Sequence, residues 1–444
     1  MSTLNNDLDN ELAEERAIDI EDVDVEEKSG PKMNVLIFGS GAREHAIAES
    51  VLRSPLLGKL FLAEPCMSKS AEIINFEDYD DLAKKCKEKQ IELVIIGPEK
   101  PLAEGIVDIL KKYGINCIGV NKEFSQLESS KLFAKKFMKK HGIKTSGYTI
   151  VTEERLPDYG KIKYPIVIKA DGLCEGKGVV IASNKAFAEK TINEYLGGKF
   201  GENSKTVLLE KFLEGEEISL MSIWDGKSLL TFAPSKDFKK LNKSPSAPNT
   251  GGMGAFCPIK MNPFQNKRLE AYQQQLAKAL TAEKADFVGF IYSGLIWNDN
   301  DWQVLEYNVR LGDPEAQVTL GHLASDFLKI LQSALKQNLG KLKPIYNEGY
   351  SACLVIACEG YPKAPKDGEK IVIPEENYRD LGIKIYYAGV TKDADGQLLS
   401  KGGRVLSLCT TASSPFPILK EFASKIKMEH KYYRHDIEVE RLHG

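Results

Sequence analysis

The sequence lacks several features that would define common protein classes. No run of about 18 apolar residues is present, so no transmembrane helix and no membrane partner are predicted. The eight cysteines form no C-x-x-C pair and only six histidines accompany them, which argues against a zinc site. A basic stripe with interleaved aromatic residues is also missing, so no nucleic-acid partner is expected. Without a secretory signal, we expect a cytoplasmic protein with reduced thiols.

Acidic residues are concentrated at the N-terminus. Residues 1–32 carry eleven acidic side chains against three basic ones, a net charge of −8, so the rest of the chain has a net charge of about +5. This composition is wrong for a mitochondrial transit peptide and favours a disordered tail. The near-helical spacing of Leu8, Leu12 and Glu15 leaves a short helix or partner arm as an alternative. The mildly basic remainder suits an anionic substrate.

Strand and helix patterns alternate after residue 32. Apolar runs are predicted as strands and the segments between them as helices, over 33–38, 44–52, 60–63, 79–89, 93–96, 106–112 and 116–119. This alternation predicts an open parallel sheet, which binds ligands beyond the carboxyl ends of its strands. The loops Gly39–Arg43 and Gly97–Lys100 lie at those ends. We therefore expect a ligand there.

The remaining chain is predicted to form a central domain and a small C-terminal domain. The central elements are a helix at 130–140, strands at 166–170, 179–182 and 206–211, a hairpin of 289–297 with 303–307, and a helix at 315–335. The polar segment 236–256 is too long to be an idle connector and is predicted to be a functional loop. The fold class is thus α/β, with α+β parts. We expect domains at 33–132, 133–342 and 343–444, after the tail 1–32.

A strand that delivers Lys169 runs into a loop with three glycines, at 172, 176 and 178. Glycines let backbone N–H groups close on phosphate oxygens, and lysines neutralise their charge. The loop does not match the Walker A pattern, and a plain hairpin with a glycine turn is the alternative.

A second candidate segment begins about thirty residues later. Glu210 ends a predicted strand, and with the backbone N–H of Leu213 it can face the edge of an adenine. Glu217 lies within reach of a ribose hydroxyl pair. A solvated acidic turn is the alternative interpretation of this segment taken alone.

Strand alternation places Glu306 and Asn308 on one face, opposite the apolar residues 305, 307 and 309. Two hard oxygen ligands suit Mg²⁺, which prefers carboxylate and phosphate oxygens. Arg310 continues on the same face and can hold a transferring phosphoryl group. The alternative is an edge strand with polar residues turned outward.

The run Pro248–Ala255 is rich in glycine, which allows the backbone to approach a ligand closely. The alternative is a flexible linker, but linkers seldom carry Met253 and Phe256 beside the glycines.

Taken together, a lysine strand, a glycine loop, Glu-x-x-Leu and Glu-x-Asn resemble the ATP-grasp superfamily. Seven strings, in this order, resemble the phosphoribosylamine–glycine ligase (GAR synthetase) family over roughly residues 33–437: GSGAREHA at Gly39, GPEKPLAEG at Gly97, QLESSK at Gln126, IKADGLCEGKGV at Ile168, PNTGGMGA at Pro248, NVRLGDPEAQ at Asn308 and GGRVL at Gly402. The combination is highly specific, although each string alone is not.

The resemblance implies an ATP-grasp central domain with a mobile lid at roughly 147–215. It also implies a monomeric enzyme of purine biosynthesis that joins glycine to 5-phosphoribosylamine through glycyl phosphate, with ATP and Mg²⁺ or Mn²⁺. Matching positions supply the ATP contacts, which are Lys131, Lys169, Gly172, Gly176, Lys177, Gly178, Glu210, Leu213 and Glu217. Metal ligands would be Glu306 and Asn308, and residues for phosphoryl transfer Arg310, Lys169 and Asp313. Substrate contacts would be Gly41, Arg43, Glu44, Glu99, Asp237, Lys239, Asn249, Thr250, Gly251, Gly252, Met253 and Gly254.

Two strings depart from the family pattern. Where the family has Pro-Gly-Asn-x-Gly, this chain has Glu64–Ser68, and where it has Gln-Asp-His-Lys-Arg, this chain has Lys236–Lys240. Both lie on the substrate side, so an ATP-grasp ligase with another carboxylate or amine remains the alternative.

Two further classes of protein are weaker alternatives. A dinucleotide-dependent oxidoreductase would fit Gly39–Gly41, but Glu44 stands where its fingerprint needs a third glycine. A catalytically inactive binding protein would not need the full ATP and metal set.

Overall fold

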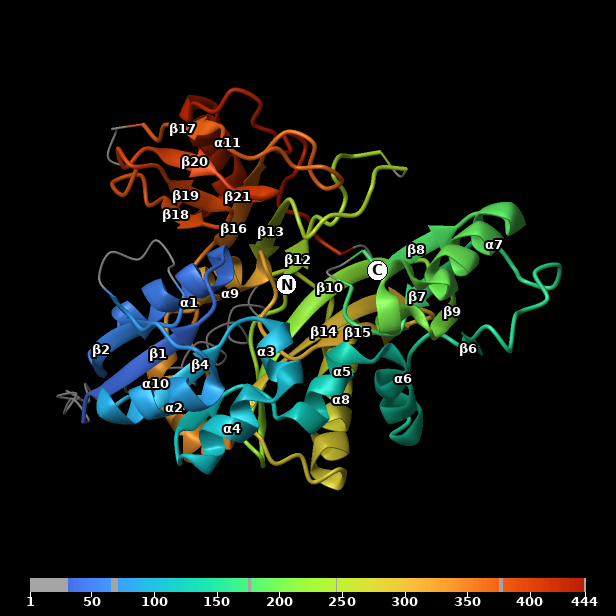
Figure 1. Ribbon diagram of the computed structural model, residues 1–444, viewed down its shortest axis with the longest axis horizontal. Helices are drawn as coiled ribbons and strands as arrows, with labels where there is room; N and C mark the ends of the chain where they lie inside the picture. The colour runs from blue at the N-terminus through green and yellow to red at the C-terminus, as the bar shows by residue number, and fades with distance from the viewer. Residues whose placement is uncertain (1–30, 65–70, 175–176, 245, 375–377, 443–444) are drawn as a thin grey trace, which may run out of the picture.

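The computed structural model describes residues 31–64, 71–174, 177–244, 246–374 and 378–442. The tail prediction for residues 1–30, most of the Glu64–Ser68 departure, and Gly176 lie outside these residues. Figure 1 shows the N-terminal sheet and the C-terminal sheet on one side of the molecule, with the central sheets extending away from them. The mixed α/β fold class is confirmed.

The N-terminal part is the predicted open parallel sheet. Its strand order is β3-β2-β1-β4-β5, and all neighbouring pairs are parallel. The strands are β1 (Met33–Phe38), β2 (Leu57–Leu62), β3 (Glu72–Ile73), β4 (Leu93–Ile96) and β5 (Asn116–Ile118). The helices are α1 (Ala42–Leu52), α2 (Tyr79–Glu88), α3 (Glu99–Glu104) and α4 (Ile106–Lys112). Both faces of the sheet are covered, since Val35, Leu36 and Ile37 are all fully buried.

The order of strands in this sheet reverses between β1 and β4. Chain progression runs outward from β1 through β2 on one side and from β4 through β5 on the other. Ligands bind at such switch points because the two flanking loops diverge there. The loops Gly39–Arg43 and Gly97–Lys100 follow these two strands, as the sequence predicted.

Among the described residues, the central part is built on two antiparallel sheets. One sheet has the order β6-β9-β7-β8 and the other β11-β10-β14-β15. The first comprises β6 (Tyr148–Val151), β7 (Ile166–Ala170), β8 (Val179–Ala182) and β9 (Val207–Lys211). The second comprises β10 (Glu216–Trp224), β11 (Leu229–Thr231), β14 (Gly289–Asn298) and β15 (Asp301–Asn308). Helices α5 (Lys122–Ser129), α6 (Lys131–Lys140), α7 (Lys185–Glu194) and α8 (Pro263–Ala282), with short helical turns at Tyr195–Lys199 and Gly201–Ser204, complete it.

The predicted hairpin is confirmed, with its turn at Asp299 and Asn300. Both residues have positive φ angles, of 51° and 58°, which is the conformation that a two-residue hairpin turn requires.

The single helix predicted at 315–335 is wrong, because the chain forms two helices there. These are α9 (Glu315–His322) and α10 (Phe327–Leu335). Leu323 leaves the helical conformation, and the side chain of Asp326 accepts a hydrogen bond from Lys329 N, which starts a new helix.

The C-terminal sheet takes strands from two distant segments. Its order is β12-β13-β16-β21-β18. The strands are β12 (Lys236–Asp237), β13 (Gly254–Cys257), β16 (Tyr350–Ala357), β18 (Lys384–Tyr387) and β21 (Arg404–Ala412). A small sheet of β17 (Lys370–Ile371), β19 (Val390–Lys392) and β20 (Leu398–Ser400), the helix α11 (Pro415–Lys425) and a turn at Leu339–Lys341 complete the fold. The segment 236–256, predicted to be an irregular loop, therefore begins and ends in strands.

None of the helices in the described ranges has both the length and the apolar character needed to cross a bilayer.

Substitution of Trp224 tests the packing of the core beneath β10. Its ring is fully buried, and Nε1 donates a hydrogen bond to Ala285 O at 3.0 Å. Replacing Trp224 with Ala should lower the free energy of unfolding by about 3–5 kcal/mol, because the ring leaves a cavity and an unpaired carbonyl. The matched variant Ile345→Ala, at a position 68% exposed, should change it by less than about 0.5 kcal/mol. Equal urea midpoints for the two variants would contradict this view of the core.

Candidate active site

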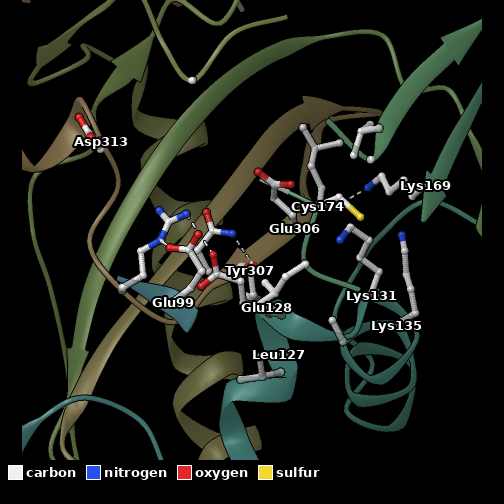
Figure 2. A pocket seen from close by; sticks show the side chains of 18 of the residues that line it. Glu99, Leu127, Glu128, Lys131, Lys135, Lys169, Cys174, Glu306, Tyr307 and Asp313 are labelled. Atoms are coloured by element: carbon white, nitrogen blue, oxygen red, sulfur yellow. Dashed lines mark hydrogen bonds and ion pairs between the residues drawn. The ribbon is translucent and has the colours of Figure 1, made fainter. Parts of the chain in front are cut away.

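One cleft lies where the two central sheets meet the N-terminal loops. It consists of two adjoining cavities of about 400 Å³ and 310 Å³, here called the larger and the smaller cavity. The residues that line both are Lys169, Val179, Glu210, Gly251, Leu305, Glu306, Asn308, Arg310 and Asp313. In Figure 2, Lys131, Lys135 and Lys169 lie on one side of the larger cavity, Glu99 and Glu128 on the other, and Glu306 between them.

The strand β15 supplies the predicted metal ligands. Glu306 and Asn308 line both cavities, while Tyr307 between them lines only the larger cavity and is buried, with its OH 3.4 Å from Tyr272 OH. Asn308 Nδ2 donates to Tyr307 O at 2.8 Å, which leaves the amide oxygen as the end available to a cation. A carboxylate and an amide oxygen that line one cleft form a donor set that fits Mg²⁺ or Mn²⁺. The residues present therefore fit the expected metal.

Arg310 is held between two carboxylates from the N-terminal side. Its Nε lies 3.3 Å from Glu99 Oε2, and its Nη2 lies 3.0 Å from Glu128 Oε1. Burial alone would lower the pKa of Arg310, but Glu128 and Glu99 outweigh it and raise the pKa. The sequence analysis missed Glu128, although it lies in the string QLESSK. Its second oxygen accepts from Val309 N at 2.8 Å and so fixes the chain just before Arg310.

Asp313 is paired with Arg404, a residue of the C-terminal sheet that the sequence analysis did not select. Arg404 Nη2 lies 3.0 Å from Asp313 Oδ2, and Nη1 donates to Asp313 O at 2.7 Å and to Gly251 O at 2.6 Å. Burial alone would raise the pKa of Asp313, but Arg404 and Arg43 lower it, so the carboxylate stays charged. The string GGRVL carried the signal for Arg404.

The N-terminal loops contribute Arg43 and Glu99 to the lining of the larger cavity. Arg43 Nε donates to Glu44 Oε1 at 2.7 Å, and Nη1 donates to Leu311 O at 3.1 Å. Glu44 is almost fully buried and lines neither cavity; its Oε2 accepts from Gly41 N at 2.8 Å. A Cβ at Gly97 would clash with the Glu44 carboxylate, so this side chain occupies the space between the two loops.

The lysines predicted to contact ATP phosphates lie beside the glycine loop. Lys131 Nζ donates to Gly172 O at 2.8 Å, and burial lowers the pKa of Lys131. Lys169 Nζ donates to Leu305 O at 2.9 Å and lies 3.1 Å from Glu210 Oε2. Gly178 lines the larger cavity. Gly172 and Lys177 line neither cavity, and a Cβ at Gly172 would clash with Asn203, so this glycine permits close packing of the loop.

The predicted base and ribose contacts surround the smaller cavity. Glu210, Leu213 and Glu217 all line it. The Glu210 side chain is buried at the end of β9, and burial would raise its pKa, but Lys169 and Lys135 lower it below the usual value. Glu217 Oε2 accepts from Lys239 Nζ at 3.0 Å.

The glycine-rich segment divides between the cleft and the core. Asn249, Thr250 and Gly251 line the smaller cavity, with Asp237 and Lys239. Gly252, Met253 and Gly254 line neither cavity. Met253 is fully buried, and a Cβ at Gly252, where φ is +108°, would clash with Pro314. These three residues pack the segment onto the C-terminal sheet.

The departure at Phe238 also faces away from the cleft. Phe238 is 7% exposed and lies within 6.1 Å, between ring centroids, of both Phe256 and Phe416. Strand alternation turns Asp237 toward the cleft and Phe238 into the core.

Comparisons with known proteins agree in one family. The chain matches profiles of the phosphoribosylglycinamide synthetase N domain over residues 33–128, its ATP-grasp (A) domain over 129–316 and its C domain over 351–439. It is 38% identical over 421 residues to the phosphoribosylamine–glycine ligase of Fusobacterium nucleatum, covering 91% of this chain and 98% of that one.

Solved structures agree with these sequence matches. The crystal structure of phosphoribosylamine–glycine ligase from Thermotoga maritima superposes with a TM-score of 0.79 at 31% identity, covering 91% of this chain and all of that one. The biotin carboxylase domain of 2-oxoglutarate carboxylase from Hydrogenobacter thermophilus, in complex with MgADP, has a TM-score of 0.67 at 18% identity and covers 91% and 92% of the two chains. At that identity the likeness shows the fold alone.

Asp237 gives the cleft a titrating group near neutrality. Burial raises the pKa of its carboxyl to about 7, with Lys239 opposing the rise and Glu315 and Glu217 adding to it. An infrared difference spectrum between the wild type and Asp237→Asn should show a protonated carboxyl at pH 5 that disappears as the pH rises through about 7. Because Lys239 favours the charged form, Lys239→Met should move the transition to higher pH. A carboxyl already ionised at pH 5 would contradict this assignment.

Proposed function

This chain belongs to the phosphoribosylglycinamide synthetase family, and from that premise we propose that its cleft joins glycine to 5-phosphoribosylamine. The reaction consumes ATP and gives glycinamide ribonucleotide, ADP and phosphate, a step of purine biosynthesis. The observation that carries the proposal is the convergence on one cleft of Lys131 and Lys169, the Glu306–Asn308 pair and Asp313. The N-terminal loops supply Arg43 to the same cleft.

The nucleotide lies across both cavities in this proposal. Glu210 and Leu213 receive the adenine, and Glu217 receives the ribose hydroxyls in the smaller cavity. Lys131 and Lys169 neutralise the phosphates beside the glycine loop 171–178. Closure of a lid, which we assign to residues 147–215, would exclude water and protect a reactive acyl phosphate from hydrolysis.

Glu306 and Asn308 would hold Mg²⁺ or Mn²⁺ against the phosphate oxygens. When bound, the cation offsets negative charge that builds up on the transferring phosphoryl group. Arg310, held charged by Glu99 and Glu128, stands beside these ligands and would bind the same oxygens from the other side.

Glycine would lie near Asp313 and the segment Asn249–Gly251. Asp313 remains a carboxylate beside Arg404 and would accept hydrogen bonds from the ammonium of glycine. One carboxylate oxygen of glycine attacks the γ-phosphorus of ATP, ADP leaves, and glycyl phosphate forms. The amine of 5-phosphoribosylamine then attacks the acyl carbon, phosphate leaves, and the nitrogen loses a proton. The residues thus act chiefly by positioning and by neutralising charge.

Arg43 and Glu99, on the N-terminal loops at the switch point of the sheet, would bind the phosphorylated sugar. Burial tends to raise the pKa of Glu99, and Arg310 and Arg43 outweigh this and lower it, so both loops present charged groups. We further propose three working domains at 33–132, 133–342 and 343–444, a monomer, and a cytoplasmic location. Six buried cysteines of the described chain are free thiols, which supports a reducing compartment.

Phosphate release from ATP and Mg²⁺ tests the substrates. Freshly generated 5-phosphoribosylamine should support release only when glycine is also present, and mass spectrometry should detect glycinamide ribonucleotide. The second candidate, an ATP-grasp ligase with another carboxylate or amine, is favoured only by the departure at Glu64–Ser68. Release with another amino or carboxylic acid, but none with glycine, would establish that candidate instead.

Glu306→Gln tests the metal assignment. The amide keeps the shape of the side chain but removes its charge, so turnover should fall by at least about 100-fold while the fold survives. Circular dichroism and the unfolding midpoint check the fold. The matched variant Glu214→Gln, at an exposed position within the segment assigned to the lid, should keep normal turnover. Near-normal activity of Glu306→Gln would remove the metal assignment.

A further inference from the structure

Lys135 is a buried ammonium in the wall of the larger cavity. It lies on α6, four residues after Lys131, and only 2% of it is exposed. Its Nζ lies 2.8 Å from Glu210 Oε2, 2.7 Å from Thr145 Oγ1 and 2.9 Å from Ser146 Oγ. All three of its protons therefore have acceptors, and the side chain has no freedom to follow a ligand.

The two carboxylate oxygens of Glu210 have different surroundings. Oε2 takes the contact from Lys135, a contact from Lys169 at 3.1 Å and a hydrogen bond from Ser146 Oγ at 2.6 Å. Oε1 is buried and has no hydrogen-bond partner among the described residues. Since Glu210 lines both cavities and is only 2% exposed, its carboxylate has one unfilled acceptor buried in the wall of the cleft. A buried acceptor without a partner is costly unless a ligand supplies a donor.

The charges of this group do not cancel. Two ammonium groups share one carboxylate, so one positive charge remains for a further anion. Burial lowers the pKa of Lys135 to about 8, against the opposing effect of Glu210, and below that pH the residue is a cation. Figure 2 shows Lys135 and Lys169 on the same side of the cavity. Lys135 can thus balance Glu210 by itself, which would leave Lys169, 3.1 Å from the same oxygen, available to a further anion.

We propose that Lys135 is a positioning residue that makes this cleft selective for a 6-amino purine nucleotide. It fixes Glu210 through Oε2, so that Oε1 accepts a hydrogen bond from the exocyclic amino group of adenine. It also serves as the counter-charge that releases Lys169 to the phosphates. The inference rests on the proposed function, because it concerns the nucleotide that the proposed ligase uses.

A purely structural role for Lys135 predicts something different. If the ion pair only supported the fold, its loss would weaken the binding of all nucleotides equally. Inosine triphosphate separates the two cases, because it differs from ATP at the base by a 6-oxo group and a protonated N1. A charged Glu210 carboxylate repels the 6-oxo group of inosine triphosphate. A displaced or protonated Glu210 would accept this base.

The experiment compares the Kd values of ATP and inosine triphosphate for the full chain, without glycine or 5-phosphoribosylamine. Wild type should bind ATP about ten- to a hundredfold more tightly, as expected for one hydrogen bond to a charged acceptor. Lys135→Met should weaken the binding of both nucleotides, because Lys169 then stays paired with Glu210. It should also reduce the ratio of the two Kd values, the preference for ATP, at least about fivefold. Lys135→Arg, which keeps the charge, should restore much of the preference. Lys136→Met, on the exposed face of the same helix, should behave as wild type.

The outcomes separate the inference from the proposed function. A folded Lys135→Met that keeps the wild-type preference for ATP would overturn the inference alone. Wild type that bound neither nucleotide would overturn the proposed function as well. Should Lys135→Met fail to fold, Ser146→Ala removes a second contact to Oε2 and should lower the preference in the same direction; an unchanged preference there would also overturn the inference.

Discussion

The short segment after β15 is the constraint on which the cleft depends. Residues 309–314 have little regular structure, yet three separate parts of the chain hold them by charged contacts. Glu128 and Glu99 bind at Val309 and Arg310, Arg43 binds the Leu311 carbonyl, and Arg404 binds Asp313. Because each of these anchors comes from outside the central sheets, the segment takes its conformation only when all the parts are in place.

This arrangement explains how the cleft holds several buried charges. Arg310, Arg404 and Lys169 in its wall each have a carboxylate partner from another element, which offsets the cost of burying them. The partners also fix the side chains before any ligand arrives. Preorganised charge of this kind stabilises a transferring phosphoryl group with little rearrangement during the reaction. The same pairs that hold the fold together at this point therefore set the electrostatics of the cleft.

The fold was predictable from the sequence wherever hydrophobic periodicity was strong. The parallel sheet and the hairpin of β14 and β15 follow from apolar runs and turn residues, and Glu306 and Asn308 follow from alternation on one strand. Alternation and glycine content could not separate Gly251, which lines the cleft, from Met253, which packs in the core. The break in the helix pattern at Leu323 was missed because apolar spacing continues across it.

The missed side chains share a physical reason. Glu128, Lys135 and Arg404 are single charged residues on helices or strands. The strings QLESSK and GGRVL contain Glu128 and Arg404, but a string does not show which of its residues reaches the cleft. Their importance comes from partners between 75 and 182 residues away, such as Glu210 for Lys135 and Arg310 for Glu128. Contacts at that separation depend on tertiary packing, so only the folded structure reveals them.

The C-terminal sheet also determines how late in synthesis the fold can be completed. Gly254 in β13 pairs with Leu354 in β16, one hundred residues later. At ribosomal rates of about 5–20 residues per second, β13 waits roughly 5–20 s for its neighbour. During that interval the apolar strand has no partner on that edge, and the segment Asn249–Gly252 lacks the anchor that Arg404 provides. The nascent chain therefore contains Lys131 and Lys169 well before it contains Arg404, so the side of the cleft at Asp313 is completed after the side with these lysines.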